Sequence, residues 1–145
     1  TDTFVYSLYP HRGGFREAGT IKLAYDLNLP MTAFSIGQQD GILPDRYSLI
    51  CCDKENVIIE TVKKAEDGED IIIRMYECFN QRTNTQITFG FDLEKVTLCN
   101  LMEEDQESIL FFERSIHITI KPYEIVTLKV KRRMTEKKED YIDKL

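Results

Sequence analysis

Residues 57–63 read VIIETVK, residues 71–77 read IIIRMYE, and the acidic stretch EDGED lies between them at residues 66–70. Both runs are rich in β-branched residues, which favour extended strands. The Asp67-Gly68 pair is typical of the turn in a β-hairpin. The sequence therefore predicts an antiparallel hairpin over residues 57–77.

Short runs that alternate apolar and polar residues continue along the chain on both sides of this hairpin. The downstream runs are Ile87–Phe91, Val96–Cys99, Ile116–Ile120 and Val126–Lys131. Upstream, residues 4–9, 31–36 and 48–52 also read as strands, and the last is apolar enough to be buried on both faces. About eight short strands at this spacing predict a mainly β protein, an antiparallel β-sandwich.

One helix is expected, over residues 15–27, where apolar residues recur at helical spacing. It should end before Pro30, because the residue that precedes a proline avoids helical geometry. Gly19 weakens this helix and allows an irregular segment. We expect residues 1–131 to form the sandwich domain and residues 132–145 to form a polar tail, either solvated or a short helix.

Length and charge restrict the class of protein. The 145 residues suit one domain, and the net charge of −6 argues against nucleic acid as a main ligand. No apolar run approaches the roughly 18 residues that cross a bilayer, so we expect no membrane partner. The first residues have neither an initiator Met nor the layout of a signal peptide, and we interpret the start as a cut inside a longer chain.

The cysteines and histidines do not predict a metal site. Cys51, Cys52, Cys78 and Cys99 include no C-x-x-C pair, and His11 and His117 are the only histidines. We expect four small apolar side chains in or near strands, with free thiols. That pattern favours a reducing compartment and a cytoplasmic protein. The alternative is one or two disulfides in a secreted protein.

No motif for catalysis stands out. The acidic groups at residues 66–70 and 103–105 lie in predicted turns, where we expect solvated carboxylates with ordinary pKa values. His117 alternates with isoleucines and should lie on the outer face of a strand. Residues 11–14, His-Arg-Gly-Gly, come closest to a phosphate-binding loop, but they fit a strand-to-helix turn better. The chain has no Trp for a sugar-binding platform, and many of its Tyr and Phe residues alternate as core residues do.

Several segments together resemble the C-terminal β-domain of glycoside hydrolase family 38, the α-mannosidases. They keep the family's order and cover most of residues 4–131. The segments are FVYSLYPHRGGFREA (4–18), AYDLNLP (24–30), VIIETVKKAEDG (57–68) with IIRMYE (72–77), VTLCNLMEE (96–104) and ITIKPYEIVTL (118–128). Two departures are Phe15, where Trp is common, and Asn80, where the family often turns on Gly.

The resemblance implies a fragment of a zinc-dependent, retaining α-mannosidase that hydrolyses terminal α-mannosyl linkages. In that family the zinc ligands and the catalytic aspartate belong to an N-terminal catalytic domain and the segment after it. None of those motifs occurs here, so no residue of this chain inherits a catalytic or zinc-binding role. The implied partners are that catalytic domain of the same chain and the α-mannoside substrate of the parent enzyme; a homo-oligomer stays open.

Within this interpretation, the loop with His11, Arg12, Gly13 and Phe15 is the candidate for contact with the substrate cleft or the catalytic domain. Two glycines beside a basic pair allow a close approach to a neighbour, and an aromatic ring follows. The competing interpretation is local packing of His11. Two other functions remain open at this point: a stand-alone carbohydrate-binding module and a protein-interaction sandwich.

Overall fold

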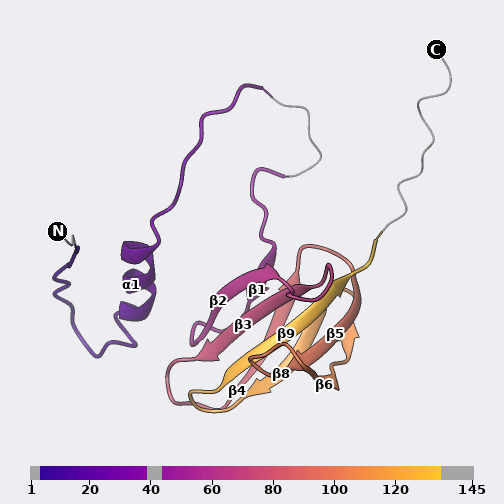
Figure 1. Ribbon diagram of the computed structural model, residues 1–145. Coiled ribbons are helices and arrows are strands. Elements are labelled where there is room, and N and C mark those ends of the chain that lie inside the picture. The colour runs from indigo at the N-terminus through magenta and orange to yellow at the C-terminus, as the bar shows by residue number, and fades with distance from the viewer. Residues whose placement is uncertain (1–3, 39–43, 135–145) are drawn as a thin grey trace. The chain divides into compact units, whose positions relative to one another are not determined.

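The computed structural model describes residues 4–38 and 44–134, and the chain divides into two compact units, residues 1–42 and residues 43–145. The first unit contains one helix, α1 (Thr20–Asn28). Within the described ranges, all strands belong to the second unit (Figure 1). They are β1 (Ile50–Cys52), β2 (Val57–Lys64), β3 (Ile71–Glu77), β4 (Thr83–Phe89), β5 (Leu93–Cys99), β6 (Asp105–Ser108), β7 (Phe111–Phe112), β8 (Ser115–Ile120) and β9 (Ile125–Arg132).

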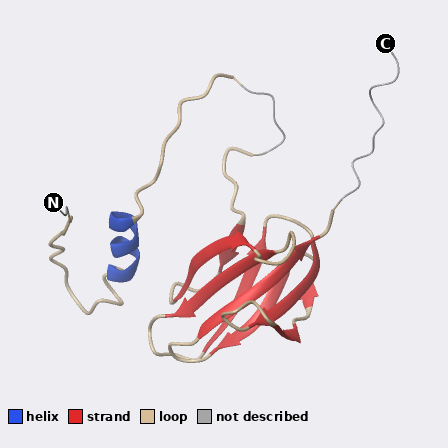
Figure 2. Cartoon of the chain, viewed as in Figure 1, coloured by secondary structure: helices blue, strands red, loops and turns tan. Residues whose placement is uncertain are grey.

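The strands form two antiparallel sheets, which confirms the predicted mainly β sandwich (Figure 2). One sheet has the order β1-β4-β8-β7, and the other has the order β2-β3-β9-β5-β6. Every pair of neighbouring strands is antiparallel. Several neighbours are distant in sequence, such as β3 with β9 and β4 with β8, so the sheets depend on long-range pairing.

The predicted hairpin is formed by β2 and β3. Its register runs from Val57 opposite Glu77 to Lys64 opposite Ile71, with an irregularity between Ile59 and Thr61. The connection is longer than a two-residue turn, because the Ala65 amide donates to the Asp70 carbonyl at 2.8 Å. Gly68 has a φ of 95°, a backbone conformation that glycine adopts without the steric cost of a Cβ atom.

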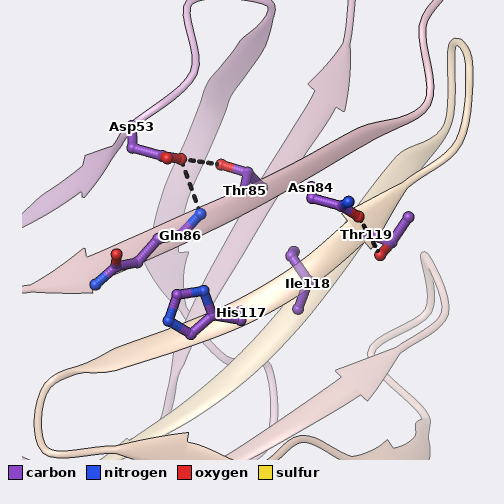
Figure 3. A pocket seen from close by; sticks show the side chains of 7 residues that line it. All are labelled: Asp53, Asn84, Thr85, Gln86, His117, Ile118 and Thr119. Atoms are coloured by element: carbon purple, nitrogen blue, oxygen red, sulfur yellow. Dashed lines mark hydrogen bonds between the residues drawn. The ribbon is translucent and has the colours of Figure 1, made fainter.

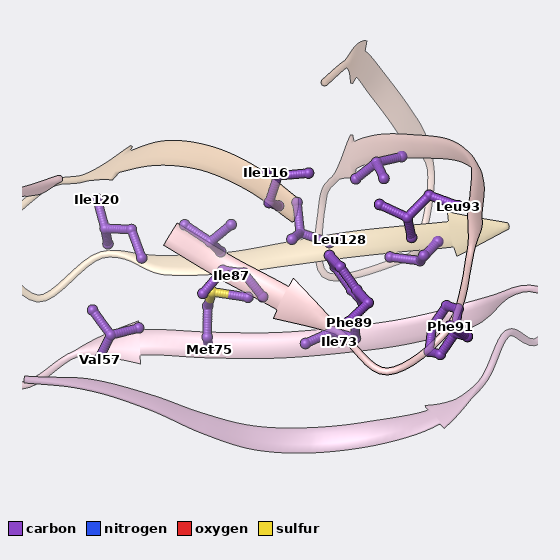
Figure 4. Packing of buried hydrophobic residues seen from close by; sticks show 13 residues of the cluster. Val57, Ile73, Met75, Ile87, Phe89, Phe91, Leu93, Ile116, Ile120 and Leu128 are labelled. Carbon is purple, nitrogen blue, oxygen red and sulfur yellow. The ribbon is translucent and has the colours of Figure 1, made fainter. Parts of the chain in front are cut away.

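The core lies between the two sheets and draws on both (Figure 4). Ile87 and Ile116 come from the four-stranded sheet, and Met75 and Leu128 from the five-stranded sheet, and none of the four is exposed to solvent. Alternation along each strand places these side chains on the inner face. Burial of such residues is the main favourable contribution to folding.

The edge strand β1 corrects one expectation. Residues 48–52 were predicted to be buried on both faces, but β1 has only three residues and Cys51 is exposed. The reason is that β1 pairs with β4 at the end of its sheet, where the outward face has no covering layer among the described residues. Asn80 has a φ of 59°, so this position does adopt the left-handed conformation that a glycine would favour.

The first unit differs from the sequence prediction in two ways. The helix starts at Thr20 instead of residue 15, because Gly19 has a left-handed φ of 63° and residues 15–19 form turns. The predicted strands at 4–9 and 31–36 are not formed, because neither run pairs with another strand among the described residues. In the same described part of the chain, no helix is long and apolar enough to cross a membrane. Most of the predicted tail, residues 135–145, lies outside the described residues.

Candidate functional site

The predicted contact loop lies in the first unit, just before α1. His11, Arg12, Gly13 and Phe15 are all exposed, Phe15 by 46%. The His11 ring lies 5.2 Å from the ring of Tyr9, centroid to centroid. Besides this ring contact, His11 makes one long hydrogen-bond contact, 3.4 Å from its Nδ1 atom to the Arg12 carbonyl. Local contacts therefore hold the His11 ring loosely and leave the basic pair open to a neighbour.

Two glycines and Glu17 shape the backbone of this loop. Gly13 has a left-handed φ of 74°. A Cβ atom at Gly14 would lie 2.8 Å from the Glu17 Oε2 atom, so a side chain there would displace this carboxylate. The Ala18 amide donates to the Gly14 carbonyl at 3.1 Å, and the Tyr9 hydroxyl donates to the Ala18 carbonyl at 3.2 Å. The glycines thus serve the turn that leads into α1.

The second unit carries a recess of about 240 Å³ on the four-stranded sheet (Figure 3). Polar side chains dominate its lining, which comes from β4, β8 and the residue after β1. The lining residues are Asp53, Asn84, Thr85, Gln86, His117, Ile118 and Thr119. Its size is below the roughly 300–1,000 Å³ of most small-molecule sites, so it suits only a small ligand.

Both oxygens of the Asp53 carboxylate have polar neighbours. Its Oδ1 atom accepts hydrogen bonds from the Thr85 hydroxyl at 2.7 Å and from the Gln86 amide at 2.8 Å. Lys54 lies 3.0 Å from the other oxygen. The hydrogen bond from Thr85, then those from Gln86 and Lys54, lower the pKa of Asp53 from 3.8 to about 2. At neutral pH this group is ionised and cannot act as a general acid.

Two pairs of lining residues lie opposite each other on the neighbouring strands β4 and β8. Gln86 on β4 is directly opposite His117 on β8, and the Thr119 hydroxyl donates to the Asn84 Oδ1 atom at 2.7 Å. His117 is exposed on the outer face of β8, as its alternation with isoleucines predicted. No local pattern groups Gln86 with His117, because the β4–β8 pairing that joins them is long-range. A recess with one ionised carboxylate lacks the second carboxyl group that glycoside hydrolysis requires.

The acidic turn at residues 103–105 was predicted to be solvated, and this is wrong for Glu103. Its side chain is 7% exposed and lies 2.7 Å from the Lys63 Nζ atom. A hydrogen bond from the Glu66 backbone amide, and then one from Lys63, lower the pKa of Glu103. Asp105 lies in β6 and not in a turn, and its hydrogen bond with Lys129 lowers its pKa. Both carboxylates thus form ion pairs with lysines from other strands. The local sequence could not indicate these pairs, because their partners are distant in sequence.

The described residues do not fit a zinc site. Among them, no group of three or more His, Cys, Asp or Glu side chains lies close enough to hold a metal ion. The four cysteines are free thiols in the structure: Cys51 is exposed, Cys52 is partly buried, and Cys78 and Cys99 are buried. All four lie in or next to strands, as predicted.

Comparisons with known proteins give a consistent result. The model of the glycosyl hydrolases family 38 C-terminal beta sandwich domain matches residues 56–128. Alpha-mannosidase G of Dictyostelium discoideum is 35% identical over 133 residues. Alpha-mannosidase 2C1 is 29% identical over 131 residues in Mus musculus and 26% identical over 130 residues in Homo sapiens. These matches cover 86–87% of this chain but only 12% of each relative.

Proposed function

Because the chain belongs to the glycosyl hydrolase family 38 C-terminal β-sandwich family, we propose that it is the non-catalytic C-terminal part of a zinc-dependent, retaining α-mannosidase. Its role is to support the catalytic domain of the same chain and the cleft in which terminal α-mannosyl linkages are hydrolysed. One observation carries this proposal: 87% of the chain matches an α-mannosidase of which it spans 12%. We place the parent enzyme in the cytoplasm, in keeping with four free thiols.

The proposal assigns zinc and catalysis to the rest of the parent enzyme. Two features of this chain support that assignment. No candidate metal cluster occurs among the described residues, and the recess carries a single carboxylate, that of Asp53, with a pKa near 2. Zinc sites use three or four ligands, and retaining glycosidases use two carboxyl groups about 5 Å apart.

Metal analysis and a chromogenic assay test this assignment. The purified 145-residue chain should hold no stoichiometric zinc and should not hydrolyse an aryl α-mannoside. The parent enzyme should bind zinc and hydrolyse the aryl α-mannoside, and a chelator should abolish its activity. Hydrolysis by the chain that survives repurification would contradict the proposal, as would a parent protein without α-mannosidase activity.

Within this function, we assign the loop with His11, Arg12, Gly13 and Phe15 to contact with the catalytic domain or the substrate cleft. The exposure of the loop and the loose hold on His11 support this assignment. In the parent enzyme, replacing His11 and Arg12 with Ala should lower kcat/KM while leaving the melting temperature of the 145-residue chain unchanged. Lys22→Ala, in α1 of the same unit, is the matched control and should leave kcat/KM unchanged. Unchanged activity in the double variant would show that the loop is local architecture only.

A second candidate function is sugar binding by the chain itself, at the recess beside Gln86 and His117. Amide and imidazole side chains can hydrogen-bond sugar hydroxyl groups. Against this stands the lining of the recess, which includes no Trp, Tyr or Phe ring on which a sugar could stack. Titration of the chain with methyl α-mannoside, followed by NMR of the Asn84 and Gln86 side-chain amides, tests it. Saturable shifts would favour this second function, and their absence would reject it.

A further inference from the structure

The five-stranded sheet buries side chains on its outer face as well as on the face that meets the core. Strand register places four residues in one row across β2, β3, β9 and β5, on the face that points away from the other sheet: Lys63, Ile72, Lys129 and Thr97. Within this row Ile72 is 0% exposed and Thr97 is 4% exposed. The outer face of an antiparallel sheet is commonly solvated, so a segment of the chain must cover this row.

The turn between β5 and β6, residues 100–104, lies over this row, and we call it the strap. The Nη2 atom of Arg74 on β3 donates to the Leu101 carbonyl at 3.1 Å. The Nζ atom of Lys129 on β9 donates to the Glu103 carbonyl at 2.7 Å. Because the order of the sheet is β2-β3-β9-β5-β6, the strap runs from β5 across β9 and β3. None of its residues belongs to the hydrophobic cluster between the sheets, so polar contacts hold it in place.

One side chain, that of Glu103, fastens the far end of the strap. Its Oε1 atom lies 2.7 Å from the Lys63 Nζ atom on β2, and its Oε2 atom accepts a hydrogen bond from the Glu66 amide at 2.9 Å. Among the hydrogen bonds and ion pairs of the described residues, these two join the strap to β2 and to the hairpin loop. Loss of this one carboxylate would therefore release the strap from that edge of the sheet.

The closed strap also has two unfavourable features. Glu103 has a left-handed φ of 66°, which a residue with a Cβ atom keeps only where its surroundings hold it. The Arg74 Nε atom is buried without a hydrogen-bond partner among the described residues, and an unpaired buried donor is destabilising. We therefore expect the strap to stay closed only while the contacts of the Glu103 carboxylate outweigh these two costs.

We propose that the strap opens as a unit while the two sheets stay folded, and that the Glu103 carboxylate is the latch that keeps it closed. Segments with few buried apolar contacts open at a lower free energy than the whole domain unfolds. Opening uncovers Ile72 and gives solvent access to Cys99, which is 5% exposed at the base of the strap. Cys99 pairs with Thr127 in the row next to that of Ile72, on the same outer face. All of these residues lie within the second unit.

Alkylation of the native 145-residue chain with iodoacetamide, followed by peptide mass spectrometry, tests the latch. Cys78 is the internal reference, because it is also buried, at 7% exposure, and its thiol donates to the Asn56 carbonyl away from the strap. Glu103→Gln should raise the rate of Cys99 relative to that of Cys78 by about 10-fold. Glu104→Gln is the matched control and should leave this ratio unchanged, because the Glu104 carboxylate accepts from Asn100 within the strap itself.

Two results of this alkylation would overturn the inference. Equal acceleration of Cys99 and Cys78 would show that Glu103 stabilises the sandwich as a whole and that no local opening occurs. An unchanged Cys99 rate would show that the strap stays closed without its carboxylate.

The partner of the latch separates opening from a change in thiol chemistry. Removal of the Glu103 anion favours the Cys99 thiolate, whereas removal of the Lys63 cation disfavours it. Opening predicts the same direction for both, so Lys63→Met should also raise the Cys99 rate relative to Cys78, with Lys64→Met as the exposed control. The double variant should react no faster than Glu103→Gln alone, because the ion pair is already broken. A slower Cys99 in Lys63→Met, or effects that multiply in the double variant, would overturn the latch.

Discussion

The Nζ atom of Lys63 on β2 lies 2.7 Å from the Oε1 atom of Glu103, which belongs to the turn between β5 and β6. Arg74 approaches the same oxygen at 3.6 Å, and the Lys129 Nζ atom donates to the Glu103 carbonyl at 2.7 Å. Glu103 has a left-handed φ of 66°, and Asn100 holds the turn by accepting hydrogen bonds from the Met102 and Glu104 amides. One turn thus binds cations from three strands of the five-stranded sheet, two through the Glu103 carboxylate and one through its backbone carbonyl.

We expect Glu103→Gln to lower the melting temperature, because Lys63 and Arg74 would then lose a buried anionic partner, and Lys63 would keep only the exposed Glu66. Glu66→Gln is the matched control. Glu66 also pairs with Lys63, but its side chain is 79% exposed, and exposed pairs contribute little. Thermal unfolding followed by circular dichroism measures both. Equal melting temperatures for the two variants would show that the buried position of Glu103 adds nothing.

Glu77 is a second buried carboxylate, and its removal should be costly. It is 0% exposed and accepts hydrogen bonds from the Asn56 side chain at 2.9 Å, the Phe79 amide at 2.7 Å and the Tyr123 amide at 3.1 Å. Glu77→Ala would take the acceptor from all three donors, of which the Asn56 side chain is buried, so the free energy of unfolding should fall by about 3 kcal/mol.

Urea unfolding measures this change, with Glu107→Ala as the control. Glu107 is exposed on β6, and surface substitutions of this kind stay within about 0.5 kcal/mol. A Glu77→Ala variant as stable as this control would mean that water replaces the carboxylate without loss.

The sequence predicted those parts of the fold that follow from local pattern. The hairpin of β2 and β3 could be predicted because β-branched residues dominate both strands and Asp67-Gly68 marks the turn. The strand β6 was missed because all four of its residues are exposed, so it has no apolar alternation. The runs at 4–9 and 31–36 have the pattern of strands but are not strands in the structure. Pattern shows where a strand can form, and only a partner makes it form.

The candidate sites show the same limit. His117 was predicted on an outer strand face, since alternation with isoleucines is local information. Its position opposite Gln86 depends on the register of β4 with β8, which the sequence does not state. Glu103 was expected in solvent because it lies in a predicted acidic turn. Its burial follows from Lys63 and Arg74, which only the folded sheet brings to it.

A glycine at the end of β4 should not tolerate a side chain. A Cβ atom at Gly90 would lie 2.5 Å from the Tyr47 hydroxyl and 2.6 Å from the Ser48 carbonyl. The Tyr47 hydroxyl also donates to the Gly90 carbonyl at 2.6 Å, so it cannot move away without losing this hydrogen bond. Gly90→Ala should therefore lower the free energy of unfolding by about 2 kcal/mol. Gly37→Ala is the control, since a Cβ atom there meets nothing within 4 Å, and an equal effect of the two would contradict the clash.

The thiols should react in an order set by their exposure. Titration of the unfolded, unreduced chain should count all four cysteines, and a count of two or none would contradict the free-thiol assignment. In the native chain, Cys51 should react first because it is exposed. Cys99 should be among the slowest, because it is buried and burial raises the pKa of its thiol. Fast reaction of Cys99 in the native chain would show that β5 opens readily.

The stability of the sandwich should fall in acid. Hydrogen bonds lower the pKa of Asp53 from 3.8 to about 2. Burial raises the pKa of Glu77, but the hydrogen bonds from Tyr123, Asn56 and Phe79 outweigh it, and the net pKa is lowered. A carboxylate whose pKa is lower in the folded chain contributes stability that is complete above its unfolded pKa. That contribution is lost as the pH falls through the folded value.

These carboxylates should therefore add no pH dependence to the free energy of unfolding near neutral pH. The free energy of unfolding should decrease from about pH 5 towards pH 2. Urea unfolding at a series of pH values measures it. Glu77→Ala should give a shallower decrease, because the variant has lost one group that binds a proton more readily in the unfolded chain. Glu107→Ala should keep the slope of the unmodified chain. A free energy of unfolding that stays constant down to pH 3 in the unmodified chain would contradict the lowered pKa values of these carboxylates.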